Sequence, residues 1–165
     1  MAGYADLLQP AQVSRIRKAL HATLRSHGVP FHRTRLVNHS YNTTFRVSLP
    51  GADVAIRVNV NSKRSVEEVR GEIAWTQSIH ETGEVDAPIP VPIFSGEPLT
   101  SLQLEGLDRA LPVVAYSWLQ GRHLSRRESR SGAFRLGEAM SRLHSAGRAF
   151  AFPAGASRPT LTDVS

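Results

Sequence analysis

The residues best suited to chemistry in this chain are a cation on a predicted strand and a carboxylate on the helix predicted after it. Arg57 lies in the strand-like run Asp53–Val58, and Glu72 follows fifteen positions later. A guanidinium can hold two phosphate oxygens at once, and a neighbouring carboxylate can hold that guanidinium in place. The pair therefore indicates a site for the α- and β-phosphates of a nucleotide.

Each of these two residues also has an ordinary structural interpretation. Arg57 would then be a surface arginine of a strand, and Glu72 an exposed carboxylate of a helix. Against this, Arg57 alternates with the apolar Val54 and Ile56, so it points to the opposite face of the strand. Glu72 has Ile73 beside it, which places it near the buried side of its helix and favours the phosphate-binding interpretation.

Three antiparallel strands are predicted around Arg57. Apolar and polar residues alternate from Tyr41 to Ser48, as expected for a half-buried strand, and Asp53–Val60 is the returning strand. Leu49–Ala52 has Pro and Gly at the two central positions of a turn. A shorter strand over Thr34–Val37 would precede them, joined by the loop Asn38–Tyr41.

Helices and further strands complete the predicted fold. An amphipathic helix over Pro10–His27 is expected to end at Gly28, and a second helix follows the capping box Ser65–Glu68. The remaining elements are two strands, at Ile93–Phe94 and Pro112–Trp118, and a last helix over Ser131–Ala146 that ends at Gly147. The sequence thus predicts an α+β fold built on a five-stranded antiparallel sheet.

Length and composition limit the classes of protein that the chain can belong to. Its 165 residues suffice for one ordinary domain, and 41% hydrophobic with 21% charged residues is typical of a folded protein. The net charge of +6 comes mostly from arginines that are scattered among acidic residues. We therefore rank a nucleic-acid-binding domain third among the functions considered and expect no nucleic-acid partner. We expect no membrane partner and a cytoplasmic location, because no apolar run or signal peptide is recognisable.

Four stretches in this order resemble the aminoglycoside phosphotransferase family, also called the phosphotransferase enzyme family. They are Asn42–Val47; Val54–Val58; Gly71–Trp75 with Ala87–Pro92; and Val113–Gly121 with Met140–His144. Members of this family are small-molecule kinases with a protein-kinase-like fold. The resemblance implies an N-terminal lobe that binds ATP, and transfer of its γ-phosphoryl group to a hydroxyl of a small substrate. The family's usual strand motif is Val-Ala-Ile-Lys, in which Arg57 replaces the lysine.

The resemblance also assigns nucleotide contacts to particular residues. The loop that contains Ser40 would cover the phosphates, and Ala55 would pack on the adenine ring. In the segment that resembles the hinge between two lobes, Tyr116 would form the back of the pocket. The Ser117 carbonyl and the Leu119 N–H would pair with the adenine. With Arg57 and Glu72, these are the predicted nucleotide-binding residues.

No catalytic or metal-binding residue is predicted in this chain. The family's catalytic loop reads like His-Gly-Asp-x-x-x-x-Asn, and none of the 165 residues matches it or the later metal-binding Asp. We therefore expect an N-terminal portion of such a kinase, with a nucleotide-binding lobe over 1–119 whose leading helix spans 1–30. Residues 120–165 would form the hinge and the start of the C-terminal lobe.

Several expectations follow from an incomplete kinase. Mg²⁺ and the small-molecule substrate would bind only with the missing C-terminal lobe. The helix that bears Met140 and Leu143 would expose apolar surface, which favours self-association or binding of the missing lobe. Whether the chain itself is an enzyme stays open. The alternative is a non-catalytic nucleotide-binding or protein-interaction module derived from this family.

Overall fold

The computed structural model describes residues 4, 7–62, 64–121 and 129–158. The chain divides into two compact units, one of Met1–Val66 with Pro90–Trp118 and the other of Glu67–Ile89 with Leu119–Ser165. The first unit contains the whole sheet, and the second contains two helices. The division predicted at residues 119 and 120 stays a prediction, and residues 122–128 lie outside the described part.

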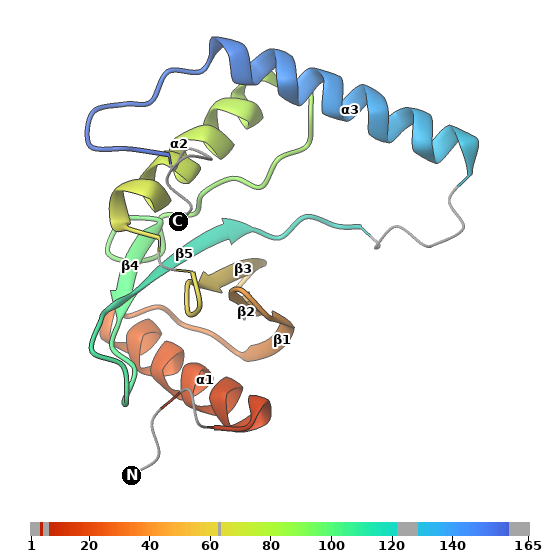
Figure 1. The fold of residues 1–165 in the computed structure, drawn as a ribbon. Helices are drawn as coiled ribbons and strands as arrows, with labels where there is room; N and C mark the ends of the chain where they lie inside the picture. Colours follow the sequence, from red (N-terminus) through yellow and green to blue (C-terminus); the bar gives the residue numbers. More distant parts are fainter. Residues whose placement is uncertain (1–3, 5–6, 63, 122–128, 159–165) are drawn as a thin grey trace. The chain divides into compact units, whose positions relative to one another are not determined.

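A five-stranded antiparallel sheet forms the first unit (Figure 1), which confirms the predicted fold class. The strand order across the sheet is β1-β2-β3-β5-β4, so β3, which carries Arg57, is central. The strands span Arg33–His39 (β1), Thr43–Leu49 (β2), Ala52–Val58 (β3), Leu99–Leu102 (β4) and Leu111–Ser117 (β5).

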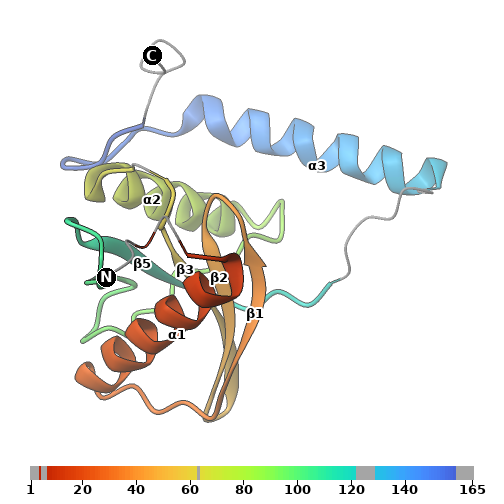
Figure 2. The ribbon, with the colours of Figure 1, turned by 60° about the horizontal axis from the view of Figure 1, so that its bottom comes forward.

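Helix α1, Gln9–Ser26, lies along one face of this sheet (Figure 2). Its apolar stripe is buried as its three- and four-residue spacing predicts, and it packs with the apolar sides of β2, β3 and β5 in one core. The stripe consists of Val13, Ile16, Leu20 and Leu24. Gly28, with a φ of 67°, adopts the left-handed conformation that ends the helix where the sequence predicted.

The hairpin between β2 and β3 follows the predicted turn, whereas the fourth strand does not lie where it was expected. Gly51 has a φ of 84°, as the third position of a type II turn requires. The strand predicted at Ile93–Phe94 is wrong, because Phe94 forms only an isolated bridge with Glu97 around a tight turn. Strand β4, which pairs with the outer side of β5, begins after this turn, at Leu99.

The loop between β1 and β2 is shorter than predicted. Strand β1 continues to His39, with a bulge between Leu36 and Asn38, so the connection comprises only residues 40–42. Tyr41, which was predicted both as the last residue of this loop and as the first of the alternating residues, lies in the loop and is 60% exposed. The bulge adds a residue to β1 that a strict alternation of apolar and polar residues does not anticipate.

The second unit contains helix α2, Val66–Thr82, and helix α3, Arg130–Ala149. Ser129 caps α3, since its hydroxyl accepts a hydrogen bond from the Gly132 N–H at 3.1 Å. The chain after α3 returns to α2, where the Ser157 N–H donates to the Glu67 carbonyl. Among the described residues, no helix combines the length and the apolar composition that crossing a membrane requires.

The predicted end of α3 at Gly147 is wrong, because the helix continues to Ala149. A Cβ at Gly147 would lie 3.3 Å from the Trp75 ring of α2. The glycine therefore serves close packing of the two helices rather than chain reversal. The Trp75 ring also contacts Phe150 edge-on, with 5.1 Å between the ring centroids.

Two helical glycines provide a matched test of this packing. A Cβ on Gly71 would clash with the Ser157 carbonyl oxygen, whereas a Cβ on Gly137 would meet nothing. We expect Gly71→Ala to lower the free energy of unfolding by about 1–3 kcal/mol through overpacking. Gly137→Ala should raise it by up to about 1 kcal/mol through helix propensity. Urea denaturation measures both, and stabilisation by Gly71→Ala would contradict the close approach.

Candidate nucleotide-binding site

The face of the sheet that α1 leaves uncovered carries the predicted phosphate-binding arginine. Val54, Ile56 and Val58 of β3 belong to the core under α1, so Arg57 between them projects from the other face. Arg57 pairs with Thr44 of β2 and with Val114 of β5. The position that the alternation predicted for Arg57 is confirmed.

Three of the predicted nucleotide-binding residues lie next to one another on this face. Ala55 pairs with Tyr116 across β3 and β5. The guanidinium carbon of Arg57 lies 5.8 Å from the centre of the Tyr116 ring, a distance typical of a cation–π contact. The small Ala55 side chain beside an aromatic ring, two residues from a guanidinium, offers an apolar surface with a cation at its edge. This arrangement suits a flat base joined to a phosphate chain.

Ser40 lies in the loop at one end of the same face. The Asn38 amide donates a hydrogen bond to the Ser40 hydroxyl at 3.0 Å, and Asn38 pairs with Thr44, the neighbour of Arg57. The loop is also anchored from the segment that follows β3. Asn61 donates from its side chain to the Ser40 carbonyl at 2.6 Å and from its N–H to the Tyr41 carbonyl at 3.2 Å.

Asn61 is a residue that the sequence did not suggest for this site. It follows β3 and reaches a loop about twenty positions earlier, and nothing in the local pattern of polar residues indicates that contact. A loop without glycine can present its N–H groups only in the conformation that such outside contacts hold. The side chain of Asn61 therefore belongs to the structure of the candidate site, although it was missed.

A second arginine on the same face is held by an acidic residue and an aromatic ring. Arg46 forms an ion pair with Asp53 and lies 4.6 Å over the ring of Trp118. The hydrogen bond from Ser48 and the Arg46 guanidinium lower the pKa of Asp53 below its ordinary value. Asp53 thus stays ionised at neutral pH. Arg46 is held by an ion pair and a ring contact that the sequence alone did not indicate.

The other predicted residues lie at the edge of the first unit or in the second. Ser117 is the last residue of β5 and pairs with Val54. Leu119 and Glu72 belong to the second unit, Glu72 on α2 and Leu119 just past Trp118. The pairing of Arg57 with Glu72 stays a prediction, as does the pairing of adenine with Ser117 and Leu119.

The part of the chain that the structure describes contains no cluster of metal ligands. Within residues 4, 7–62, 64–121 and 129–158, no three His, Asp or Glu side chains gather closely enough to hold a metal ion.

Comparison with protein-family models identifies the chain. The model of the phosphotransferase enzyme family matches residues 32–165, which is most of the sequence. The chain belongs to the phosphotransferase enzyme family. Helix α1 precedes the residues that the family model matches. No curated protein matches the sequence.

Solved structures similar to this family member share its fold. A microcompartment-associated aminopropanol kinase is 22% identical with a TM-score of 0.70, over 90% of this chain and 45% of the kinase. The amicoumacin kinase hAmiN, in complex with AMP-PNP, Ca²⁺ and Ami, is 14% identical with a TM-score of 0.72, over 95% of this chain and 48% of hAmiN. The chain thus spans about half the length of each of these kinases.

The anchoring of the loop by Asn61 can be tested directly. We expect Asn61→Ala to raise the amide hydrogen-exchange rates of residues 40–42, because the variant lacks the side-chain donor to the Ser40 carbonyl. The lost hydrogen bond should lower the free energy of unfolding by about 1 kcal/mol. Exchange measured by NMR checks this, with Gln77→Ala on α2 as the control. Unchanged exchange in the loop would show that the strands alone hold it.

Proposed function

We propose that this chain is the ATP-binding portion of a small-molecule phosphotransferase. The family reaction transfers the γ-phosphoryl group of ATP to a substrate hydroxyl. The observation that carries the proposal is the cluster of Arg57, Ala55 and Tyr116 on the sheet face away from α1. The likeness to kinases of about twice this length supports it.

Different residues of this face would contact different parts of the nucleotide. Ala55 and Tyr116 would contact the adenine, with the Ser117 carbonyl and the Leu119 N–H as its hydrogen-bond partners. Arg57 would bind the α- and β-phosphates through its planar fork, and the Ser40 loop would cover them. The contact of Arg57 with the Tyr116 ring would limit the conformations of the guanidinium, so that less entropy would be lost on binding.

The chemical step would need residues outside these 165. The printed sequence contains no counterpart of the catalytic-loop Asp and Asn. Mg²⁺, when bound, would neutralise charge on the β- and γ-phosphates. Its ligands would belong to the second lobe of a complete enzyme, and so would the residues that choose the small-molecule substrate.

Removing the guanidinium of Arg57 should weaken ATP binding to the 165-residue chain by at least about tenfold. The reason is that a hydrogen bond to a charged group contributes about 1.5–3 kcal/mol. Arg57→Lys should retain most of the affinity, because it keeps the charge. Isothermal titration calorimetry with ATP measures the change for Arg57→Ala.

Arg35→Ala is the matched control for this experiment. Arg35 is exposed on β1 and pairs with Arg46, so it lies on the same sheet face at a distance from β3. The control should bind ATP within about twofold of the wild type, since exposed charges at that distance are screened. Equal losses in Arg35→Ala and Arg57→Ala would mean that affinity follows net charge, and the site would be wrong.

The predicted pairing of Arg57 with Glu72 requires a double-mutant cycle. Glu72→Gln alone should reduce ATP affinity, because the guanidinium would lose the carboxylate that positions it. In the Arg57→Ala background the same change should have little effect, so the two changes should not be additive. Additive losses of affinity would separate the two residues and argue against a kinase-type phosphate site.

A second candidate function, a protein-interaction module, is favoured by the surface of α3. None of its residues is buried, and Phe134, Leu136 and Met140 are 69%, 46% and 49% exposed. Apolar residues at this density on one helix are typical of a surface that another protein covers. We expect the chain to self-associate, and Met140→Glu with Phe134→Glu to reduce this in light scattering. A monomer at high concentration that binds no ANS would exclude this function.

A further inference from the structure

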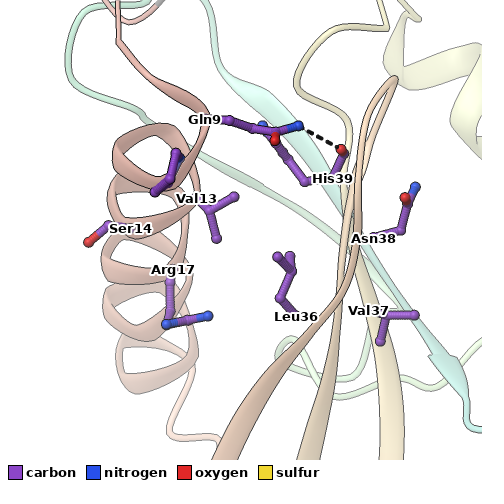
Figure 3. Close-up of a pocket in the computed structure, with 9 residues that line it drawn as sticks. Gln9, Val13, Ser14, Arg17, Leu36, Val37, Asn38 and His39 are labelled. Atoms are coloured by element: carbon purple, nitrogen blue, oxygen red, sulfur yellow. Dashed lines mark hydrogen bonds between the residues drawn. The ribbon is translucent and has the colours of Figure 1, made fainter.

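A cavity of about 520 Å³ lies between α1 and β1 (Figure 3). This volume is in the range of small-molecule sites. The residues that line it are Gln9, Pro10, Val13, Ser14, Arg17, Leu36, Val37, Asn38 and His39. All of them belong to the first unit, so the cavity is a feature of that unit alone.

Arg17 is the only charged residue among those that line the cavity. Its guanidinium carbon lies 5.6 Å from the centre of the Phe45 ring, which holds the side chain against the sheet. The Nε atom of Arg17 is buried and has no hydrogen-bond partner among the described residues. A buried donor without a partner is costly, and the Arg17 guanidinium therefore has a hydrogen-bond capacity that the described residues leave unused.

The wall near Asn38 and His39 is held in place without adding charge. The His39 ring contacts the Thr43 hydroxyl at 2.7 Å and the Gln12 side-chain oxygen at 3.2 Å, and Gln9 donates to the His39 carbonyl at 3.4 Å. Burial lowers the pKa of His39, so the ring is neutral at pH 7. The cavity is therefore formed in advance, and its charge is that of Arg17.

The surroundings of the cavity favour a negative ligand. No Asp or Glu occurs from residue 7 to residue 52, whereas Arg15 and Lys18 lie on α1 with Arg17. Positive charge without compensating acids raises the local concentration of anions. Figure 3 shows Val13 and Leu36 pointing toward one another across the space beside Arg17, so an apolar surface adjoins the cation.

We propose that this cavity is a second binding site, for a small amphipathic anion. A carboxylate or phosphate group would bind the Arg17 guanidinium, which matches either group with two parallel hydrogen bonds. The apolar part of the ligand would contact Val13 and Leu36. Its cation is distinct from that of the proposed nucleotide site, because α1, which carries Arg17, and Arg57 lie on opposite faces of the sheet.

Titration of the ¹⁵N-labelled chain with four probes tests the ligand class. Octanoate and octyl phosphate carry both a chain and an anionic group, octylamine carries a chain and a cation, and acetate carries the anion alone. We expect at least one of the first two to shift the amide signals of residues 13–17 and 36–39 saturably. Octylamine and acetate should bind at least about tenfold more weakly, because each lacks one of the two contacts.

Substitution of Arg17 separates a specific contact from general charge. Arg17→Met keeps the side-chain stem, and we expect it to weaken octanoate binding at least about tenfold. Lys18→Gln removes the same charge from the next residue, which is exposed and does not line the cavity. The affinity of this control for octanoate should lie within about twofold of the wild-type affinity. Arg17→Lys should retain part of the affinity, because it keeps the charge.

Three results would overturn the proposal. They are no saturable shift with either anionic probe up to about 10 mM, equally tight binding of octylamine, and an equal loss in Lys18→Gln and Arg17→Met. The first two are measured on the wild-type chain, so they decide the question even where Arg17→Met fails to fold. A preference between octanoate and octyl phosphate would identify the anionic group.

Discussion

The alternation of side chains along β2 and β3 is the constraint on which the rest of the first unit depends. Phe45, Val47, Val54 and Ile56 point to the side that α1 covers, and each is almost completely buried. Because successive strand residues point to opposite faces, the same alternation must place Arg57 on the other face. A shift of register by one residue would exchange the two sets, so the core and the candidate nucleotide site are specified together.

Polar contacts between distant segments then hold the edges of this sheet. The His27 ring, at the end of α1, contacts the Ser95 hydroxyl at 2.8 Å and the Thr100 hydroxyl at 3.1 Å, which connects the helix to β4. At the other edge, the contacts of His39 connect α1 to β1. Each contact is worth about 1 kcal/mol. Their joint effect is to hold α1 in register with the sheet, which keeps the Arg17 cavity open between them.

The two faces of the sheet thus support two different proposals from one fold. One face offers Arg57 beside an aromatic ring and a small residue, and the other offers Arg17 beside aliphatic side chains under α1. In both, an arginine lies against an aromatic ring, which helps to orient its guanidinium. Arg46, on the same face as Arg57, is held by an ion pair with Asp53 as well as by the Trp118 ring.

The sequence by itself determined the elements whose signals are local. The α1 stripe, the Pro-Gly turn and the side of β3 on which Arg57 lies all follow from spacing along a few residues. Only the tertiary structure decided the place of β4, the continuation of α3 through Gly147, the Asn61 contact with the Ser40 loop and the cavity at Arg17. Each of these depends on a partner far away in the sequence, and a one-dimensional pattern carries no record of which distant residue will lie beside it.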